Sequence, residues 1–122
     1  PFCTDMQQQA AEHWSGDVLL VMVSCPPGKA DSIALGLLEA GLAACINIVP
    51  SIKSFYRWQG KVQHDNESLM LIKCAANNLM ALQERVLELH PYELPEIITV
   101  SVTGGLPAYL DWVLQPYKNN SE

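Results

Sequence analysis

Residues Cys45–Val62 read CINIVPSIKSFYRWQGKV, and their pattern determines how the rest of the chain is arranged. Between Cys45 and Ile52, apolar residues occupy nearly every second position, which predicts a strand with one buried face. Pro50 lies inside this run. Because proline cannot donate a hydrogen bond to a β-ladder, it predicts a kink, a bulge or a change of pairing there. Gln59-Gly60 then predicts a turn, so we expect one long, bent strand that enters a hairpin.

Aromatic residues gather near the tip of this hairpin, where Tyr56 and Trp58 lie two positions apart. A small domain has little use for such an arm alone, so we expect the arm to contact a neighbouring chain. Aromatic residues dominate interface energetics, and we therefore predict that Tyr56, Trp58 and the more distant Trp112 pack an interface between subunits. The alternative is that these three residues line a small-molecule cleft.

The composition indicates one globular domain that hides surface in an oligomer. The chain has 122 residues, of which 49% are hydrophobic and 16% charged. A net charge of −6 argues against a nucleic-acid partner, because nucleic-acid binding needs basic patches. The longest apolar run, Val18–Val23, is too short to span a bilayer, and we expect neither a membrane partner nor a signal peptide. Four cysteines without paired spacing are typical of reduced thiols and a cytoplasmic location.

The rest of the chain predicts further elements on both sides of the hairpin. Residues 17–24 form an apolar strand, and a helix over 30–40 ends at Gly41, which suits a left-handed conformation. After a polar stretch at 63–66 we expect a strand over 67–75, then a helix capped by Asn77 or Asn78. A last strand over 96–103 and a short helix from Pro107 complete a single domain over 17–117. Residues 1–16 and 118–122 are expected to be tails.

The resulting order is β-α-β-β-α-β with a C-terminal helix, which predicts an α+β fold with a ferredoxin-like antiparallel sheet. Right-handed crossovers place both main helices on one face of this sheet. The other face is then uncovered although its strands are apolar. We therefore expect self-association to cover it.

Several motifs resemble the CutA (divalent-cation-tolerance) family, and they span the chain from about Val18 to Val113. They are VMVSCP at 21–26, LAACINIVP at 42–50, SFYRWQGK at 54–61, HPYELPEI at 90–97 and YLDW at 109–112. The resemblance implies a ferredoxin-like fold and a tight homotrimer built through the long hairpin strands. It also implies a link to divalent-metal tolerance, with copper as a bound metal and no organic cofactor.

The resemblance further implies a metal site at Cys25 and His90, with Glu96 matching a family carboxylate nearby. A thiolate and an imidazole together suit copper and other soft metals. Some relatives carry a second histidine before His90, where this chain has Leu89. The alternative is that Cys25 is a packed strand end and His90 a helix stop bonded to backbone. The spacing of these residues supplies no CxxC or HxxxH motif that would decide between the two.

Two functions therefore stay open, and a third is not supported. The first is a trimeric protein that binds copper or other divalent metals in metal tolerance. The second is a trimeric signalling or scaffold module that binds a small ligand or a partner protein in clefts between subunits. The third, a small isomerase or lyase, finds no support, because no serine–histidine–acid pattern is present and Cys25 has no evident base, so we expect no enzyme. Lys61 and Glu67 could bind an anion or form a surface pair on the hairpin.

Overall fold

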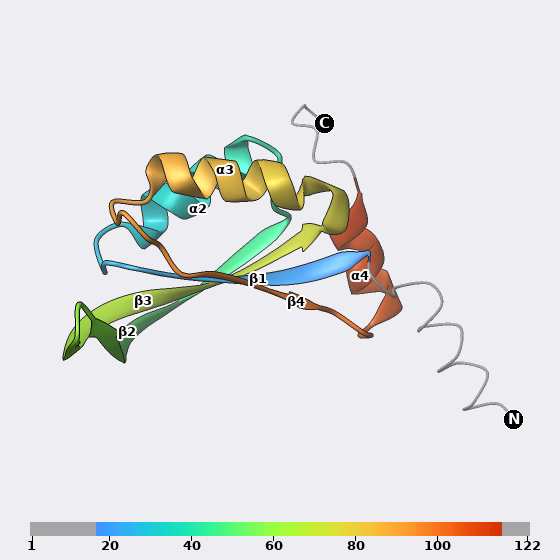
Figure 1. Ribbon diagram of the computed structural model, residues 1–122. Helices are drawn as coiled ribbons and strands as arrows, with labels where there is room; N and C mark the ends of the chain where they lie inside the picture. The colour runs from blue at the N-terminus through green and yellow to red at the C-terminus, as the bar shows by residue number, and fades with distance from the viewer. Residues whose placement is uncertain (1–16, 116–122) are drawn as a thin grey trace, which may run out of the picture.

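The computed structural model describes residues 17–115, and Figure 1 shows their arrangement. The strands are β1 (Val18–Cys25), β2 (Cys45–Trp58), β3 (Lys61–Ala75) and β4 (Ile97–Ser101). The helices are α2 (Ala30–Glu39), α3 (Leu79–Leu89) and α4 (Pro107–Leu114), with a 3₁₀ turn at Ala76–Asn78. The predicted order of elements is therefore confirmed, whereas the expected tails at 1–16 and 118–122 lie outside the described residues.

The four strands form one antiparallel sheet in the order β2-β3-β1-β4, as a ferredoxin-like α+β fold requires. Helices α2 and α3 lie side by side on one face of this sheet (Figure 1). Side chains alternate along a strand, so every second residue of β1 points toward the helices. Val21, Val23 and Cys25 have no exposed surface and pack there against Ile33 and Leu37 of α2. The predicted fold class is thus confirmed.

The opposite face of the sheet carries no helix over most of its area (Figure 1). The intervening residues of the strands point to this face, and they include Leu20 and Met22 of β1. Ile98 and Val100 of β4 pair with those two residues and are 48% and 43% exposed. The uncovered face is therefore apolar within a single chain, as the strand patterns predict.

Strands β2 and β3 extend far beyond the rest of the sheet. They contain 14 and 15 residues, whereas β1 contains 8. Because β1 ends where Cys25 pairs with Ser68, residues 52–58 and 61–67 form a two-stranded ribbon, here called the arm (Figure 1). Gln59 and Gly60 turn the chain with φ angles of 52° and 80°, which confirms the predicted hairpin turn. The polar stretch at 63–66 belongs to β3, because it pairs with β2 along the arm.

A β-bulge beside Pro50 decides which side chains of the arm face the uncovered side. The pairing steps from Val49↔Leu69 to Ile52↔Glu67, so β2 contains one residue more than β3 across this step. Ser51 takes a φ of 62°, in the left-handed region that L residues rarely adopt. One extra residue reverses the alternation of β2 beyond the bulge. The predicted irregularity at Pro50 is confirmed, and its effect is to turn every second residue from Ile52 onward to the face that Glu67 occupies.

Two local expectations differ from the structure. Asn78 precedes α3, but neither of the predicted caps makes a side-chain capping bond. The cause is the 3₁₀ turn, in which the backbone N–H of Leu79 donates to the carbonyl of Ala76 and leaves the first turn less in need of a cap. Strand β4 is also shorter than predicted, at five residues. Within residues 17–115, no helix has the length and apolar character needed to cross a membrane.

Candidate functional site

A pocket of about 620 Å³ lies between the arm and the turn that joins α3 to β4. We call it the hairpin pocket. It is lined by Ser24, Tyr56, Trp58, Asp65, Glu67, Pro91, Tyr92, Glu93, Leu94, Pro95 and Glu96. Its volume falls within the range of roughly 300–1,000 Å³ that is usual for small-molecule sites.

The bulge in β2 supplies the aromatic wall of this pocket. Beyond the bulge, Tyr56 and Trp58 point to the same side of the arm as Asp65 and Glu67, which follow the unbroken alternation of β3. The hydroxyl of Tyr56 donates a hydrogen bond to Asp65 on that side. Without the extra residue, Phe55 would take the place of Tyr56 and face the pocket instead. The bulge thus places the aromatic residues of β2 on the same face of the arm as the acidic residues of β3.

Glu67 anchors the turn to the arm. Its side chain is only 6% exposed, and its Oε2 accepts a hydrogen bond from the Tyr92 hydroxyl at 3.0 Å. Burial is the first cause that raises the pKa of Tyr92, to about 12, and the bond to Glu67 is the second. Tyr92 is therefore a neutral donor at physiological pH. At the other end of the turn, the Ser24 hydroxyl donates to Oε1 of Glu96 at 2.9 Å.

His90 ends α3 and holds the start of the turn through both of its ring nitrogens. The backbone N–H of Tyr92 donates to Nδ1 of His90 at 3.1 Å, so Nδ1 acts as an acceptor. Nε2 then carries the proton and donates to the carbonyl of Ser24 at 2.8 Å. The His90 ring also contacts the Tyr92 ring, with the centroids 4.8 Å apart. These bonds fix a neutral imidazole in a position that is 7% exposed.

Cys25 lies close to this turn in sequence and fold, but its thiol faces the other side of the sheet. It belongs to the core beneath the helices, whereas its neighbour Ser24 points to the hairpin pocket. Burial, and then the charge of Glu67, raises the pKa of the Cys25 thiol. A thiol with a raised pKa is a poor metal ligand and a poor nucleophile at neutral pH.

The three residues predicted as metal ligands therefore lie near the end of β1, but their side chains do not converge on one point where a metal ion could bind. Both nitrogens of His90 are engaged with backbone, Glu96 accepts from Ser24, and the Cys25 thiol is buried on the opposite face. Across residues 17–115, no group of three His, Cys, Asp or Glu side chains is placed to hold a metal ion. In this conformation of one chain, the three residues do not fit copper without rearrangement. That they bind metal stays a prediction.

The residues predicted for an interface separate into two locations. Tyr56 and Trp58 line the hairpin pocket and are 41% and 42% exposed. Trp112 lies on α4, at the opposite end of the sheet from the arm, where it is 48% exposed and contacts Tyr109 (Figure 1). Lys61 pairs with Trp58 at the tip of the arm and is not among the described lining residues of the pocket, so the structure separates it from Glu67.

No role for Asp65, Tyr92 or Glu93 can be predicted from the sequence. Tyr92 and Glu93 belong to the HPYELPEI motif, and the motif's two prolines predict a stiff turn but not what the turn would face. Asp65 lies in the polar stretch of the arm. It pairs with Ser54, and the register that the bulge creates puts the Tyr56 hydroxyl within bonding reach of it on the same side of the arm.

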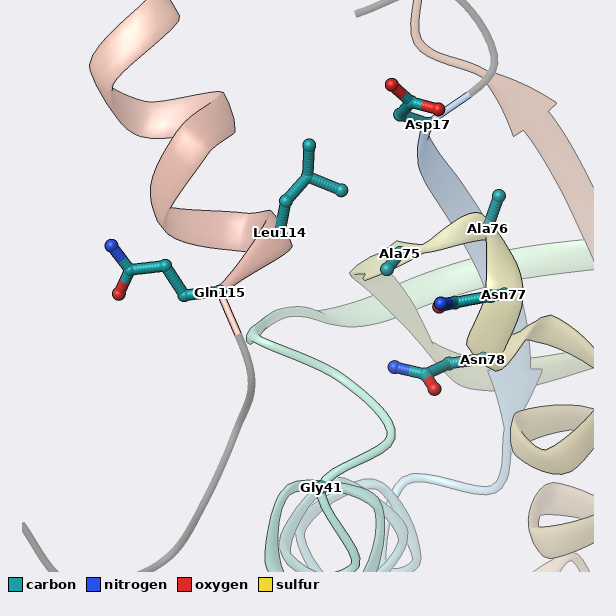
Figure 2. Close-up of a pocket in the computed structure, with 8 residues that line it drawn as sticks. All are labelled: Asp17, Gly41, Ala75, Ala76, Asn77, Asn78, Leu114 and Gln115. Atoms are coloured by element: carbon teal, nitrogen blue, oxygen red, sulfur yellow. The ribbon is translucent and has the colours of Figure 1, made fainter.

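A second cavity, of about 480 Å³, lies at the far end of the sheet, between the end of α4 and the 3₁₀ turn. Figure 2 shows Leu114 and Gln115 on one side of it and Asn77 and Asn78 on the other. Among its described lining residues, Asp17 is the only charged side chain, and none is aromatic. The hairpin pocket therefore offers the richer chemistry for recognising a ligand.

Comparison with known proteins places this architecture in one family. Residues 19–116 match the family described as "CutA1 divalent ion tolerance protein". "Divalent-cation tolerance protein CutA" of Thermus thermophilus is 45% identical over 95 residues, which are 77% of this chain and 92% of that protein. "Protein CutA homolog" of Xenopus laevis is 44% identical over 100 residues, which are 81% of this chain and 66% of that protein. The chain thus spans just under two thirds of the Xenopus protein.

Solved structures of CutA proteins have the same fold as this chain. The crystal structure of CutA from Xylella fastidiosa superposes with a TM-score of 0.77 and 44% identity, covering 80% of this chain and 94% of that one. The crystal structure of CutA1 from Oryza sativa gives a TM-score of 0.78 and 40% identity, covering 81% and 92% of the two chains. With the sheet order, the long arm and the turn motif all in place, this chain belongs to the CutA1 divalent ion tolerance family.

Proposed function

We propose that this protein acts in divalent-cation tolerance as a homotrimer, and that its hairpin pocket is the site where it binds a small ligand. The observation that carries the proposal is the convergence of the arm and the turn on Glu67. A bulge, a buried carboxylate and a stiff proline-bounded turn cooperate to form one concave, aromatic pocket. Pockets of this size with a few convergent polar groups are the usual form of a ligand site.

The apolar surfaces of the single chain support assembly. The arm is a two-stranded ribbon, and such ribbons are at best marginally stable in isolation. The uncovered face of the sheet exposes Ile98 and Val100 beside it. Within residues 17–115, the two tryptophans lie at opposite ends of the sheet, Trp58 on the arm and Trp112 on α4. Two different patches at opposite ends favour head-to-tail contacts, which close into a ring, and a trimer is such a ring.

The test of this proposal has two parts. Light scattering at micromolar protein should give three times the chain mass, and a monomer would contradict the assembly. A thermal-shift screen with cationic, neutral and anionic small molecules should find compounds that raise the melting temperature, because a ligand at 100 times its dissociation constant adds about 2.7 kcal/mol. Tyr92→Phe, which removes the hydroxyl bonded to Glu67, should weaken the response. A screen without any stabilising compound would contradict a ligand site.

Copper binding by Cys25, His90 and Glu96 is the second candidate. It is favoured by one observation, that all three side chains belong to residues grouped at the end of β1: His90 and Glu96 bond to Ser24, and Cys25 follows it. Because copper(I) prefers sulfur and imidazole, and a bound thiol must lose its proton, binding should strengthen as pH rises. The test is a copper titration of Cys25→Ser and His90→Ala in a background without Cys3 and His13. Unchanged affinity in both variants would rule this site out.

We propose a binding role and not a catalytic one, and a cytoplasmic location. The neutral, doubly bonded His90 and the buried thiol of Cys25 support the first part, since neither is available as base or nucleophile. The free thiols of Cys25, Cys45 and Cys74 support a reducing compartment. Fractionation of cells that produce the protein tests the location, and recovery outside the cytoplasm would contradict it.

A further inference from the structure

We propose that the hairpin pocket recognises an organic cation, an ammonium or guanidinium group carried on a small apolar body. This inference rests on the proposed ligand-binding function and names the chemical class of the ligand. Its support comes from the charge of the pocket, from the way its carboxylates are bonded, and from the type of its walls.

The described lining of the pocket is acidic and contains no basic side chain. Four carboxylates line it, and none of the described lining residues is Lys, Arg or His. These residues are Asp65, Glu67, Glu93 and Glu96. A concave site lined by charges of one sign concentrates ions of the other sign. The pocket therefore disfavours anions and attracts cations.

The carboxylates are positioned by neutral donors, which leave their charge uncompensated. Tyr92 donates to Glu67, Tyr56 to Asp65 and Ser24 to Glu96.

Each of these hydroxyls occupies one acceptor position of a carboxylate that offers about four. A carboxylate that is 6% exposed, as Glu67 is, gains most from a cationic partner, because buried charges are costly unless they are paired. The hydroxyls orient the carboxylates, and a ligand cation would neutralise them.

The walls select an organic cation over a bare metal ion. Tyr56, Trp58 and Tyr92 contribute aromatic rings, and aromatic faces attract ammonium and guanidinium groups. Pro91, Leu94 and Pro95 supply an apolar surface that a hydrated metal ion would not use. Within the described residues, no three carboxylate, thiol or imidazole groups are placed to hold a metal. A cationic head with an apolar body matches both halves of the pocket.

The cation could come from a free compound or from a basic side chain of another copy of this chain. Arg57 and Lys61 lie at the tip of the arm, outside the pocket of their own chain. In an assembly built through the arms, one of them could reach a neighbour's pocket. The recognised chemistry is the same in both cases, and the experiment separates the two sources.

The experiment is a calorimetric titration of the full chain with three probes that share one body: phenethylammonium, phenethyl alcohol and phenylacetate. The ammonium compound should bind at least about tenfold more tightly than the alcohol, a difference of about 1.4 kcal/mol. Phenylacetate should bind more weakly still. Glu67→Gln and the exposed-site variant Glu93→Gln should each weaken ammonium binding about tenfold, whereas Glu84→Gln, an exposed carboxylate on α3, should not.

The outcomes separate this inference from the function on which it rests. Equal or tighter binding of the alcohol or of phenylacetate would overturn the cation while leaving a ligand site. An equal loss in Glu84→Gln would overturn the pocket as its location. If the wild type binds no probe but Arg57→Ala/Lys61→Ala binds phenethylammonium, the cation is supplied by a neighbouring chain. If neither protein binds any probe, the inference is overturned, and a thermal-shift screen that also finds no ligand would remove the proposed function.

Discussion

Replacing Trp58 by alanine should weaken the trimer far more than it weakens the fold of one chain. Trp58 is 42% exposed in the single chain, and a fully exposed Trp offers roughly 250 Å². If a neighbouring subunit covers that exposed part, about 100 Å² leaves water. At about 25 cal/mol per Å², this contributes about 2.6 kcal/mol per chain and about 8 kcal/mol per trimer.

Dilution measures this effect directly. Because trimer dissociation depends on the square of concentration at its midpoint, a loss of about 8 kcal/mol raises the midpoint by several hundredfold, to order of magnitude. Light scattering and sedimentation over a dilution series give the midpoint, and circular dichroism of the dissociated chain checks that it stays folded. Met80→Ala is the matched control, since Met80 is 74% exposed on α3, away from the arm. Equal midpoints for the two variants would refute an interface at Trp58.

Three further predictions concern the fold. Leu37→Ala should lower the free energy of unfolding by about 2–5 kcal/mol in chemical denaturation, because Leu37 of α2 is fully buried in the main core. Leu35→Ala, at a position that is 57% exposed, should change it by about 0.5 kcal/mol or less, and similar losses in the two variants would contradict this core. Gly41→Ala should lower the free energy of unfolding by about 1–2 kcal/mol, because Gly41 has a φ of 72° in the left-handed region. Gly28→Ala is the control and should leave this free energy nearly unchanged, since a Cβ added there meets nothing within 4 Å. Equal effects of the two substitutions would count against the left-handed turn at Gly41. Burial raises the pKa of the Cys74 thiol from 9.0 to about 11, so between these pH values the folded state keeps a proton that the unfolded chain releases. The contribution of this thiol to the free energy of unfolding is therefore fully present below pH 9 and should be lost as the pH rises to about 11. Cys74→Ala should show a shallower decline in the same melts, and an equal slope would contradict this cause.

Local patterns were enough to predict the elements and the arm. Alternation in β2, the proline inside it and the Gln59-Gly60 turn each follow from the chemistry of one or two residues, and the structure confirms all three. The cap at Asn77 or Asn78 failed because backbone bonds of the 3₁₀ turn compete with a side-chain cap at the same position. Such competition is decided by local geometry, which the residue type does not specify.

The hairpin pocket could not be predicted, because it depends on register. Which of Phe55 and Tyr56 faces Glu67 changes with a single extra residue in β2. Proline indicated an irregularity but not its size. The bond from Tyr92 to Glu67 likewise joins residues 25 positions apart, across a turn whose direction no local pattern specifies.

The solvent accessibility of Trp58 tests most directly the claim that the arm brings chains together around the hairpin pocket. In a Trp14→Phe/Trp112→Phe background, Trp58 is the remaining tryptophan, and acrylamide quenching of its fluorescence reports its exposure. If the arm forms the interface, the quenching constant should be low at micromolar protein and should rise on dilution through the dissociation midpoint found by light scattering. A quenching constant that is the same at every concentration, at the level of a half-exposed side chain, would contradict the claim.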